Sequence, residues 1–540
     1  MRLSMSELKN SEQWKKADIL LPQYDVAEVS RRTKKNPIWV HMGIGNIFRI
    51  FIGGIADRLL TEGLMDRGIT CVESYDYEVI DKIFLPHDNL ALSVTLRGDG
   101  SEECRVLGAF SETVKAQRVD TEAWTRLKEI FRDRELQMVS FTITEKGYAL
   151  KKTDGMYFDS VQNEINNGPE EAQGAMAVVT AMLRERYLAG QAPLALVSMD
   201  NCSQNGAVLR RAVLTIAEEW ERKGYVDADF VAYVNDEERI SFPWTMIDKI
   251  TPRPSEKVAE DLYKKGVMGM EPIVTSKQTY IAPFVNAEGP EYLVVEDHFP
   301  NGRPPLEKAG VYMTDRETVN RSERMKVTAC LNPIHSALGP YGCVLGYEWF
   351  SDEMRDPEML ALARQIGYGE GLPVAPNPGI FSPKEFLDEV LEERFPNPYL
   401  GDTPQRLSVD ISQMLGIRFG ETIKAYVKKD GSAKGLIGIP LAVAGWLRYL
   451  LGVDDRGNSI KLAPDPMLGQ LQEKLSGIVF GDPESLMRQP YEILSNEHLF
   501  GIDLYKAGIG ECIEELLREE ISGEGAVRRT LKKYLSRKDN

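Results

Sequence analysis

The chain has 540 residues, enough for two or three domains with sizeable cores. Its formal net charge is −17, so it lacks the overall basic character that most nucleic-acid-binding proteins show. Hydrophobic residues make up 43% and charged residues 27% of the chain, which is ordinary for a soluble globular protein.

Cysteine spacing and hydropathy indicate the cellular compartment in which the protein is expected. Six cysteines are scattered along the chain, and none forms a Cys-x-x-Cys pair. This favours reduced thiols over a disulfide framework or a zinc ribbon. The N-terminus has no apolar stretch of signal-peptide length, and the most apolar run, 435–447, contains Pro440 and is too short to span a bilayer. We therefore expect a cytoplasmic protein that has a buried helix at this run and is not embedded in a membrane.

The first nucleotide-binding signal follows a polar N-terminal arm. A buried strand is predicted over 38–42, Gly43 and Gly45 come next, and 50–60 has helical apolar spacing. Strand, glycine turn and helix begin a dinucleotide-binding βαβ unit, in which the helix N-terminus faces the pyrophosphate. Phe48 stands where the third glycine of Gly-x-Gly-x-x-Gly would be, so a plain tight turn is the alternative.

An acidic residue follows the next predicted strand, 69–72. A ribose-binding carboxylate is expected roughly 20–30 positions beyond the glycines. We favour Glu73 for this role, with Asp76 as second choice, and the alternative is a solvated loop acid. A carboxylate at this place would favour NAD over the phosphorylated cofactor.

Strand and helix patterns alternate through the rest of the first half, as in a parallel sheet covered by helices. Residues 90–96 and 105–110 are predicted to form a short antiparallel excursion. The other predicted strands are 138–143 and 194–199, with further strand-like runs in 278–295, and the predicted helices are 121–133, 171–188 and 207–223.

Polar residues follow two of these strands, at the sheet edge where open α/β sheets collect ligands. They are 144–146 after one strand and 200–205 after the other. The amides of the second group could face a substrate or form an Asx turn. The segment 241–252 is predicted to be a loop or short helix that carries a single carboxylate, Asp248.

A Gly/Pro cluster at 302–305 marks a turn, and we place the domain boundary just after it. Beyond residue 310 strand patterns stop and helical periodicity dominates. The prediction is therefore an α/β Rossmann-like domain over residues 1–310 and a mainly α-helical domain over 311–540. The helical segments are 317–329, 357–366, 383–394, 413–427, 436–451, 467–479, 502–519 and 524–535.

Polar chemistry is concentrated at 323–335, where Lys326, Asn332 and His335 lie within ten residues. Asn332 and His335 are three apart, so on a helix they share a face. A carbonyl or alcohol held there could meet a base, a hydrogen-bond donor and a polar orienter. The alternative is structural, because Asn332 followed by Pro333 is also a good N-cap and first-turn pair.

Six segments together resemble the polyol-specific long-chain dehydrogenases, also called the mannitol dehydrogenase family. Each segment is weak alone, but all six occur in the family's order and they span most of the chain. They are 41–49, 142–148, 198–206, 242–252, 296–304 and 326–338.

The resemblance implies a role for each matching residue. Lys326 would be the general base or acid on the reacting oxygen, and Asn332 and Asn201 would polarise that oxygen. His335 would orient the substrate, assisted by Asp248 and Glu323. No metal is implied, and the cofactor is expected to be NAD, with the candidate cofactor-binding residues Gly43, Ile44, Gly45, Asn46, Ile47, Arg49, Glu73, Thr144, Glu145 and Lys146.

The chain departs from the family pattern at two places. The lysine usually lies five residues before the asparagine, whereas Lys326 lies six before Asn332. Six residues of a regular helix turn about 240°, which would point the two side chains apart. A π-bulge or local break at 328–331 would restore convergence. Met414 stands where several relatives carry a lysine, which puts a substrate contact there in doubt.

The Asn-Pro-Ile-His segment and the chain length look most like the hexuronate-processing branch of the family. This implies reduction of D-fructuronate to D-mannonate, with mannitol 2-dehydrogenase or tagaturonate reductase as alternatives. A basic residue should then bind the substrate carboxylate. Arg303 and Arg418 are candidates, although a surface ion pair is the favoured interpretation of Arg418.

A hypothesis of another class is a non-catalytic nucleotide-sensing protein on the same fold. The combination of Lys326, Asn332 and His335 speaks against it, because a sensor needs no base. The expected partner is a small sugar acid or polyol, with no nucleic acid and no membrane, and both monomer and homodimer remain open.

Overall fold

The computed structural model describes residues 1–536 of the chain. It divides into two compact units, which are described separately. Unit 1 comprises Met1–Leu96 and Gly100–Asn320, and unit 2 comprises Arg97–Asp99 and the chain from Arg321 onward. The boundary expected after residue 310 lies ten residues before this division.

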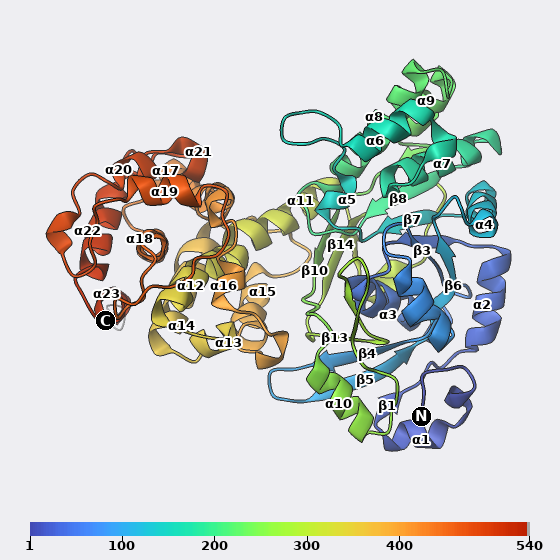
Figure 1. Ribbon diagram of the computed structural model, residues 1–540, viewed down its shortest axis with the longest axis horizontal. Coiled ribbons are helices and arrows are strands. Elements are labelled where there is room, and N and C mark those ends of the chain that lie inside the picture. The colour runs from blue at the N-terminus through green and yellow to red at the C-terminus, as the bar shows by residue number, and fades with distance from the viewer. Residues whose placement is uncertain (537–540) are drawn as a thin grey trace. The chain divides into compact units, whose positions relative to one another are not determined.

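Unit 1 is built on a six-stranded sheet in which all neighbouring strands run parallel (Figure 1). Its four central strands are buried at every position, as a parallel sheet covered on both faces requires. This confirms the predicted Rossmann-like α/β domain. In sheet order the strands are β6 (Phe110–Lys115), β3 (Ile69–Glu73), β2 (Trp39–Met42), β7 (Met138–Phe141), β8 (Leu194–Ser198) and β9 (Ile240–Ser241).

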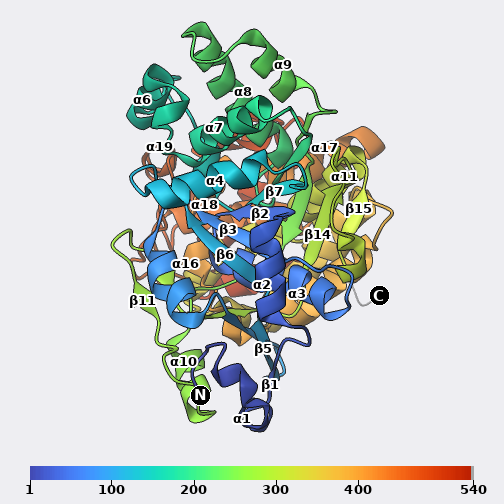
Figure 2. The same cartoon turned by 90° about the vertical axis from the view of Figure 1, so that its right-hand side faces the viewer.

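Each face of this sheet has its own hydrophobic core. Trp39 belongs to one core and Val40 to the other, because successive residues of a strand point to opposite faces. The first core includes α3 (Gly53–Thr61), and the second includes α4 (Thr121–Arg132), α7 (Ala175–Leu188) and α8 (Asn205–Arg222). Figures 1 and 2 show these helices around the sheet from two directions.

Unit 1 contains three smaller sheets. The four-stranded one has the order β1 (Ile19–Leu20), β5 (Glu102–Leu107), β4 (Ala91–Leu96), β13 (Phe284–Ala287), and β4 and β5 form the predicted antiparallel pair. The three-stranded one has the order β10 (Thr245–Asp248), β14 (Tyr292–Glu296), β15 (Tyr312–Thr314), and the last sheet joins β11 (Ile273–Val274) to β12 (Tyr280–Ile281).

Three strand predictions were wrong. The segment 241–252 is not a loop or short helix, because Thr245–Asp248 pairs antiparallel with β14 about fifty residues later. The predicted strand 105–110 is two strands separated at Gly108, and the second, β6, joins the parallel sheet. Strands also do not stop at residue 310, since Tyr312–Thr314 pairs with β14.

The remaining helices of unit 1 connect these strands. They are η1 (Glu7–Lys9), α1 (Ser11–Lys16), α2 (Val26–Lys35), η2 (Phe48–Ile52), η3 (Ile80–Phe84), η4 (Leu85–His87), α5 (Glu145–Tyr148), α6 (Asp159–Asn167), η5 (Pro169–Glu171), α9 (Ala228–Asn235), α10 (Glu256–Lys264) and η6 (Leu306–Ala309).

Unit 2 is helical, as predicted, and residues 321–536 form no strand. Its centre is α18 (Gly438–Leu450), which is buried at all of its positions and packs against α12 (Asn332–Leu345) and α22 (Gly510–Glu520). This helix is the apolar run for which a buried helix was predicted. None of the helices within residues 1–536 has the length and apolar character needed to cross a membrane.

The carboxylate of Glu370 caps the N-terminus of α18. Its Oε1 accepts from the backbone N–H groups of Ile437 and Gly438, and its Oε2 accepts from that of Ile439. A buried acid at this end of a helix satisfies otherwise unpaired amides and opposes the helix dipole. Glu370 therefore anchors the central helix of unit 2.

Short helical segments complete this part of the chain. They are α11 (Arg316–Met325), η7 (Lys326–Cys330), α13 (Phe350–Glu353), α14 (Pro357–Arg364), η8 (Gln365–Gly371), η9 (Leu372–Val374), α15 (Pro383–Glu389), η10 (Val390–Arg394), η11 (Pro398–Leu400), α16 (Pro404–Leu407), η12 (Ile411–Gln413), η13 (Gly416–Gly420), α17 (Glu421–Asp430), α19 (Leu468–Lys474), η14 (Pro483–Ser485), α20 (Tyr491–Leu494), α21 (Glu497–Phe500) and α23 (Ala526–Leu535).

Candidate functional site

The glycine turn after β2 is crowded on one side and open on the other. Gly43 has a φ of +90°, and a Cβ at this position would lie 2.3 Å from the carbonyl oxygen of Thr142. A Cβ on Gly45 would meet no atom within 4 Å. The backbone therefore offers an open approach at Gly45, where the next helix begins and its first amides have no intrahelical partner.

Phe48, in the place of the third glycine, has a structural role. Its ring stacks on the imidazole of His41 with centroids 4.1 Å apart. His41 is buried between Ser140 and Thr142, and burial lowers its pKa to about 3, so the ring is neutral. In the Gly-x-Gly-x-x-Gly pattern the third glycine lets the helix pack closely against the sheet. Here Gly53 has this role, because a Cβ at its position would lie 2.4 Å from the ring of Phe110.

Arg49, expected at the cofactor turn, is fully buried. Its Nη1 donates to the carbonyl of Ala282 at 2.6 Å, and its Nη2 donates to Oδ1 of Asn46 at 2.8 Å. Burial lowers the pKa of Arg49 to about 9. The side chain thus ties the start of the helix, at Asn46, to the segment that leads into β13.

Glu73, the favoured ribose ligand, lies at the end of β3 and is 7% exposed. Its Oε1 accepts from the backbone N–H groups of Ser74, Tyr75 and Asp76, and its Oε2 accepts from that of Ile44 at 3.3 Å. Burial raises the pKa of Glu73, while these N–H groups act in the opposite sense. The carboxylate links its own loop to the glycine turn.

Asp76, the second choice, is also buried. Its Oδ2 accepts from the hydroxyl of Thr275 at 2.6 Å. Its Oδ1 is buried and has no hydrogen-bond partner within residues 1–536.

The ends of β7 and β8 are joined by a partly buried acid, Asp200, to which sequence analysis assigned no role. Asp200 accepts from the backbone N–H groups of Ile143 and Thr144, both at 2.9 Å, and from the hydroxyl of Tyr148 at 2.6 Å. Thr144 has φ +66° and ψ 160°, a conformation that is nearly restricted to glycine. Asp200 therefore holds a strained turn whose residues Thr144, Glu145 and Lys146 are exposed.

The two asparagines after β8 have different surroundings. Asn201 is exposed. Asn205 is buried, and its side chain donates to the carbonyl of Thr245 and accepts from the N–H of the same residue. Asn205 thus fixes β10, whose last residue is the partly exposed Asp248.

The catalytic lysine proposed from the sequence begins a π-helix. Lys326 is 2% exposed and is the first residue of η7. The N–H of Leu331 donates to the carbonyl of Lys326 at 3.1 Å, and Leu331 then leaves the helical region with φ −134° and ψ −65°. The predicted irregularity between the lysine and the asparagine is confirmed, and it starts two residues earlier than expected.

Asn332 is the first residue of α12, and the N-cap position belongs to Leu331. The capping role that the sequence left open is therefore not the one Asn332 takes. The residue is partly exposed, while its Oδ1 is buried and has no hydrogen-bond partner in the described chain. Its side chain has an unmet capacity for hydrogen bonding beside the π-helix.

The imidazole of His335 is oriented by two phenylalanines. It stacks on Phe395 with centroids 4.5 Å apart and meets Phe350 edge-on at 5.2 Å. These contacts were missed by sequence analysis, because both rings come from segments 15 to 60 residues away and carry no motif.

The two candidate carboxylate-binding arginines differ in their surroundings. Arg303 is held by two acids, Asp297 at 2.7 Å and Glu307 at 2.6 Å, which raise its pKa. Arg418 donates from Nη1 to the hydroxyl of Ser336 at 2.6 Å and forms no ion pair within residues 1–536. Burial lowers the pKa of Arg418 to about 10.

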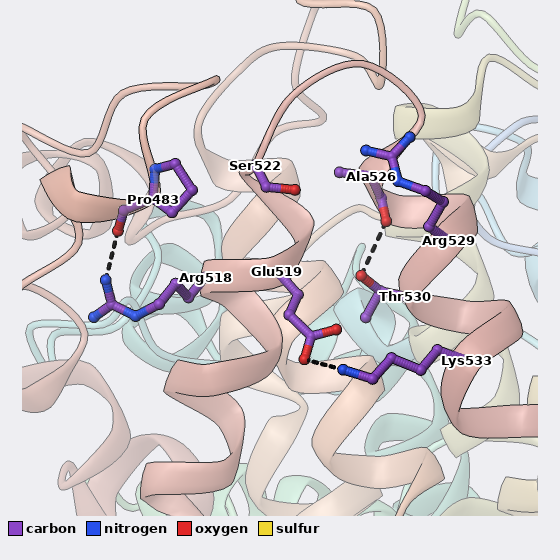
Figure 3. Close-up of a pocket in the computed structure, with 8 residues that line it drawn as sticks. All are labelled: Pro483, Arg518, Glu519, Ser522, Ala526, Arg529, Thr530 and Lys533. Carbon is purple, nitrogen blue, oxygen red and sulfur yellow. Dashed lines mark hydrogen bonds and ion pairs between the residues drawn. The ribbon is translucent and has the colours of Figure 1, made fainter.

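A separate cavity of about 320 Å³ lies in unit 2 between α22, α23 and Pro483 (Figure 3). The charged groups in its wall are already paired. Arg518 donates to the carbonyl of Pro483, and Lys533 pairs with Glu519 at 2.6 Å. We assign this cavity no part in the chemistry. Within residues 1–536, no group of three or more His, Cys, Asp or Glu side chains is arranged to hold a metal ion.

Comparison with known proteins agrees with this geometry. The model of the mannitol dehydrogenase Rossmann domain matches residues 37–308, and that of the mannitol dehydrogenase C-terminal domain matches residues 318–517. The chain belongs to the mannitol dehydrogenase family. It is therefore an oxidoreductase that acts on CH–OH groups of polyols or sugar acids, and the nucleotide-sensing alternative is wrong.

Individual members of the mannitol dehydrogenase family match over nearly the full length. A D-mannonate oxidoreductase of Thermotoga maritima is 49% identical, with 100% of each chain covered. The structure of Pseudomonas fluorescens mannitol 2-dehydrogenase in ternary complex with NAD and D-mannitol has a TM-score of 0.72 at 26% identity, covering 99% of this chain and 100% of that one. A substrate-free D-sorbitol dehydrogenase has a TM-score of 0.78 at 26% identity, covering 95% and 98%.

Proposed function

We propose that the protein is an NAD-dependent reductase that interconverts D-fructuronate and D-mannonate. The observation that carries this proposal is the full-length, 49% identical D-mannonate oxidoreductase of Thermotoga maritima. A D-mannonate oxidoreductase of Escherichia coli, 28% identical over 80% of this chain, supports the same substrate class. The buried Lys326, followed at once by Asn332 and His335, provides the acid–base chemistry that such a reaction needs.

The residues of the glycine turn fit a dinucleotide. Gly45 leaves room for a pyrophosphate to approach the backbone, and the helix start at Asn46 presents unpaired amides toward it. Ile44 and Ile47 complete the turn, and Arg49 holds it in place. Glu73 accepts four N–H groups, and its Oε2, which takes only one of them, can still accept a ribose hydroxyl. When bound, the dinucleotide supplies the two-electron redox step.

Lys326 is proposed to manage the proton. In the direction of reduction its ammonium gives a proton to the oxygen of the reacting carbonyl, and in oxidation its neutral amine takes that proton back. Lys326 is 2% exposed, so few water molecules can compete for that proton. The reaction consumes one proton, so Lys326 must regain one from solvent after each reduction.

Amides and the imidazole are proposed to hold the substrate. The Nδ2 of Asn332 can donate to the oxygen on which negative charge develops, which lowers the barrier. His335, fixed by two phenylalanines, would set the orientation of a neighbouring hydroxyl. Asn201, Asp248 and Glu323 are proposed to assist in binding and orienting the substrate, and Thr144–Lys146 in binding the cofactor.

The experiment is a substrate panel with the purified full-length chain. D-Fructuronate, D-tagaturonate, D-fructose and D-xylulose are each offered with NADH, and the loss of near-ultraviolet NADH absorbance is followed. We expect the highest kcat/KM with D-fructuronate and D-mannonate as the product. A dominant rate with fructose would refute the uronate assignment, and a dominant rate with tagaturonate would replace the substrate by its isomer. The same panel with NADPH tests the choice of cofactor.

A further inference from the structure

Arg418 is a partly buried cation with spare hydrogen-bond donors. A guanidinium carries five N–H donors. Only one of them is used in the described chain, in the bond from Nη1 to the hydroxyl of Ser336. No carboxylate lies within ion-pair distance of Arg418 in residues 1–536, although the side chain is partly buried. Its charge is therefore poorly compensated.

Two buried arginines of the chain show how such a charge can be compensated. Arg186 makes five hydrogen bonds to backbone carbonyls, using Nε, Nη1 and Nη2. Arg448 makes three, again from all three nitrogens. Burying a charge without such partners is unfavourable. Arg418 differs from both, since its Nε and Nη2 donate to no group in the described chain and are left for a ligand.

The position of Arg418 relates it to the proposed catalytic residues of the same unit. It lies in η13 (Gly416–Gly420), which packs against both η7 and α12. Ser336, its hydrogen-bond partner, is buried and directly follows His335. The hydroxyl of Thr422 donates to the carbonyl of Thr328 at 2.9 Å, which joins the segment after Arg418 to the π-helix that Lys326 begins.

Arg418 is also accessible. It is only partly buried, whereas Arg186 and Arg448 are sealed in the core. A planar guanidinium with adjacent free donors matches a carboxylate, which it binds through two parallel hydrogen bonds. Ser336 accepts a hydrogen bond from Nη1 of Arg418 and so fixes the direction of the guanidinium.

We infer that Arg418, oriented by Ser336, binds the carboxylate of the substrate and selects sugar acids over neutral polyols. This inference rests on the proposed function and adds the residue that makes it specific. The other candidate, Arg303, already has its charge matched by Asp297 and Glu307 and is not needed for this role.

The test compares an acidic with a neutral substrate in Arg418→Gln. With D-fructuronate we expect kcat/KM to fall about 100-fold or more, mainly through KM, because a charged hydrogen-bonded pair is lost. With D-fructose, or with mannitol in the oxidative direction, we expect a change of less than about threefold. Inhibition by D-mannonate should weaken in parallel with the loss on D-fructuronate, and NADH affinity should stay unchanged.

Two further variants separate binding from structure. Arg418→Lys keeps the charge but loses the planar fork, so it should recover part of the affinity for D-fructuronate. Arg355→Gln removes an exposed arginine of the same unit that pairs with Asp352, and it should match the wild type on every substrate. In Arg418→Ala, added guanidinium chloride should restore part of the activity toward D-fructuronate only.

The outcomes distinguish the inference from the function on which it rests. Equal losses on acidic and neutral substrates in Arg418→Gln, with NADH affinity intact, would mean that Arg418 only supports α12, and would overturn the inference alone. A wild-type enzyme that reduces fructose but neither hexuronate would refute the proposed function and the inference together.

Discussion

Glu520 and Tyr341 form a buried hydrogen-bonded pair in unit 2. The hydroxyl oxygen of Tyr341 lies 2.6 Å from Oε1 of Glu520 and 2.7 Å from the carbonyl oxygen of Leu441. The one proton of the Tyr341 hydroxyl is directed at both acceptors, Oε1 of Glu520 and the carbonyl oxygen of Leu441. Burial raises the pKa of Glu520 to about 8.

The sign and size of the effect on stability follow from this shift. Between the usual pKa of 4.5 and the folded value of about 8, the folded state holds a proton that the unfolded state has lost. The stability that this group contributes is fully present below pH 4.5 and is lost as the pH rises through about 8. The slope is about 1.4 kcal/mol per pH unit, so the loss can reach about 5 kcal/mol across the interval.

The variant Glu520→Gln tests this raised pKa, because glutamine is neutral at every pH and its amide oxygen can still accept from Tyr341. Urea unfolding followed by tryptophan fluorescence at pH 6, 7, 8 and 9 gives the free energy of unfolding of both proteins. We expect the wild type to lose stability relative to the variant as the pH rises. The control Glu519→Gln, at a partly exposed carboxylate paired with Lys533, should show no such trend. A constant difference between wild type and Glu520→Gln at all four pH values would refute the raised pKa of Glu520.

Three further predictions concern the cap, the strained turn and the base. Glu370→Ala removes the acceptor of three backbone N–H groups, so the free energy of unfolding should fall by about 3 kcal/mol or more, and calorimetry that shows less than about 1 kcal/mol would contradict the cap. Asp200→Ala should also lower the melting temperature. Adding Thr144→Gly to Asp200→Ala should restore part of the lost melting temperature. The relieved backbone strain, about 1–3 kcal/mol, exceeds the entropic cost of glycine, about 0.5–1 kcal/mol. If the double variant instead loses the sum of both destabilisations, Thr144 is not strained. Lys326→Met should lose about 100- to 10,000-fold in kcat with NADH affinity intact by fluorescence titration, and an equal loss of NADH binding would argue against Lys326 as the base.

The parallel sheet could be predicted because each of its central strands can be recognised from its own short stretch of sequence. The central strands are short apolar runs bounded by glycine and polar residues, and burial on both faces leaves no ambiguity about their type. The strand β10 could not be predicted in the same way. Phe242-Pro243 and Pro252 look like breakers, and the pairing that makes Thr245–Asp248 a strand comes from β14, far along the chain.

The candidate site shows the same division between local and distant information. The mismatch of one residue between Lys326 and Asn332 predicted an irregular helix, because helical periodicity depends on neighbouring residues alone. The clamp of Asp200 on Thr144 spans 56 residues, and its acceptor bonds depend on two strand ends meeting at one edge of the sheet. Spacing along the chain gives no sign of such a bond.

The two arginines make the physical reason clear. The pairing of Arg303 with Asp297 and Glu307 bridges six and four residues, so the sequence itself holds the information that this charge is compensated. The environment of Arg418 depends on Ser336, which is 82 residues away, and on the lack of any carboxylate within ion-pair distance of its guanidinium in residues 1–536. Whether the charge of an arginine is compensated depends on every residue that surrounds it in the folded chain. For this reason only the folded chain could reverse the interpretation of Arg418, from the surface ion pair favoured by composition to a binding group for a carboxylate.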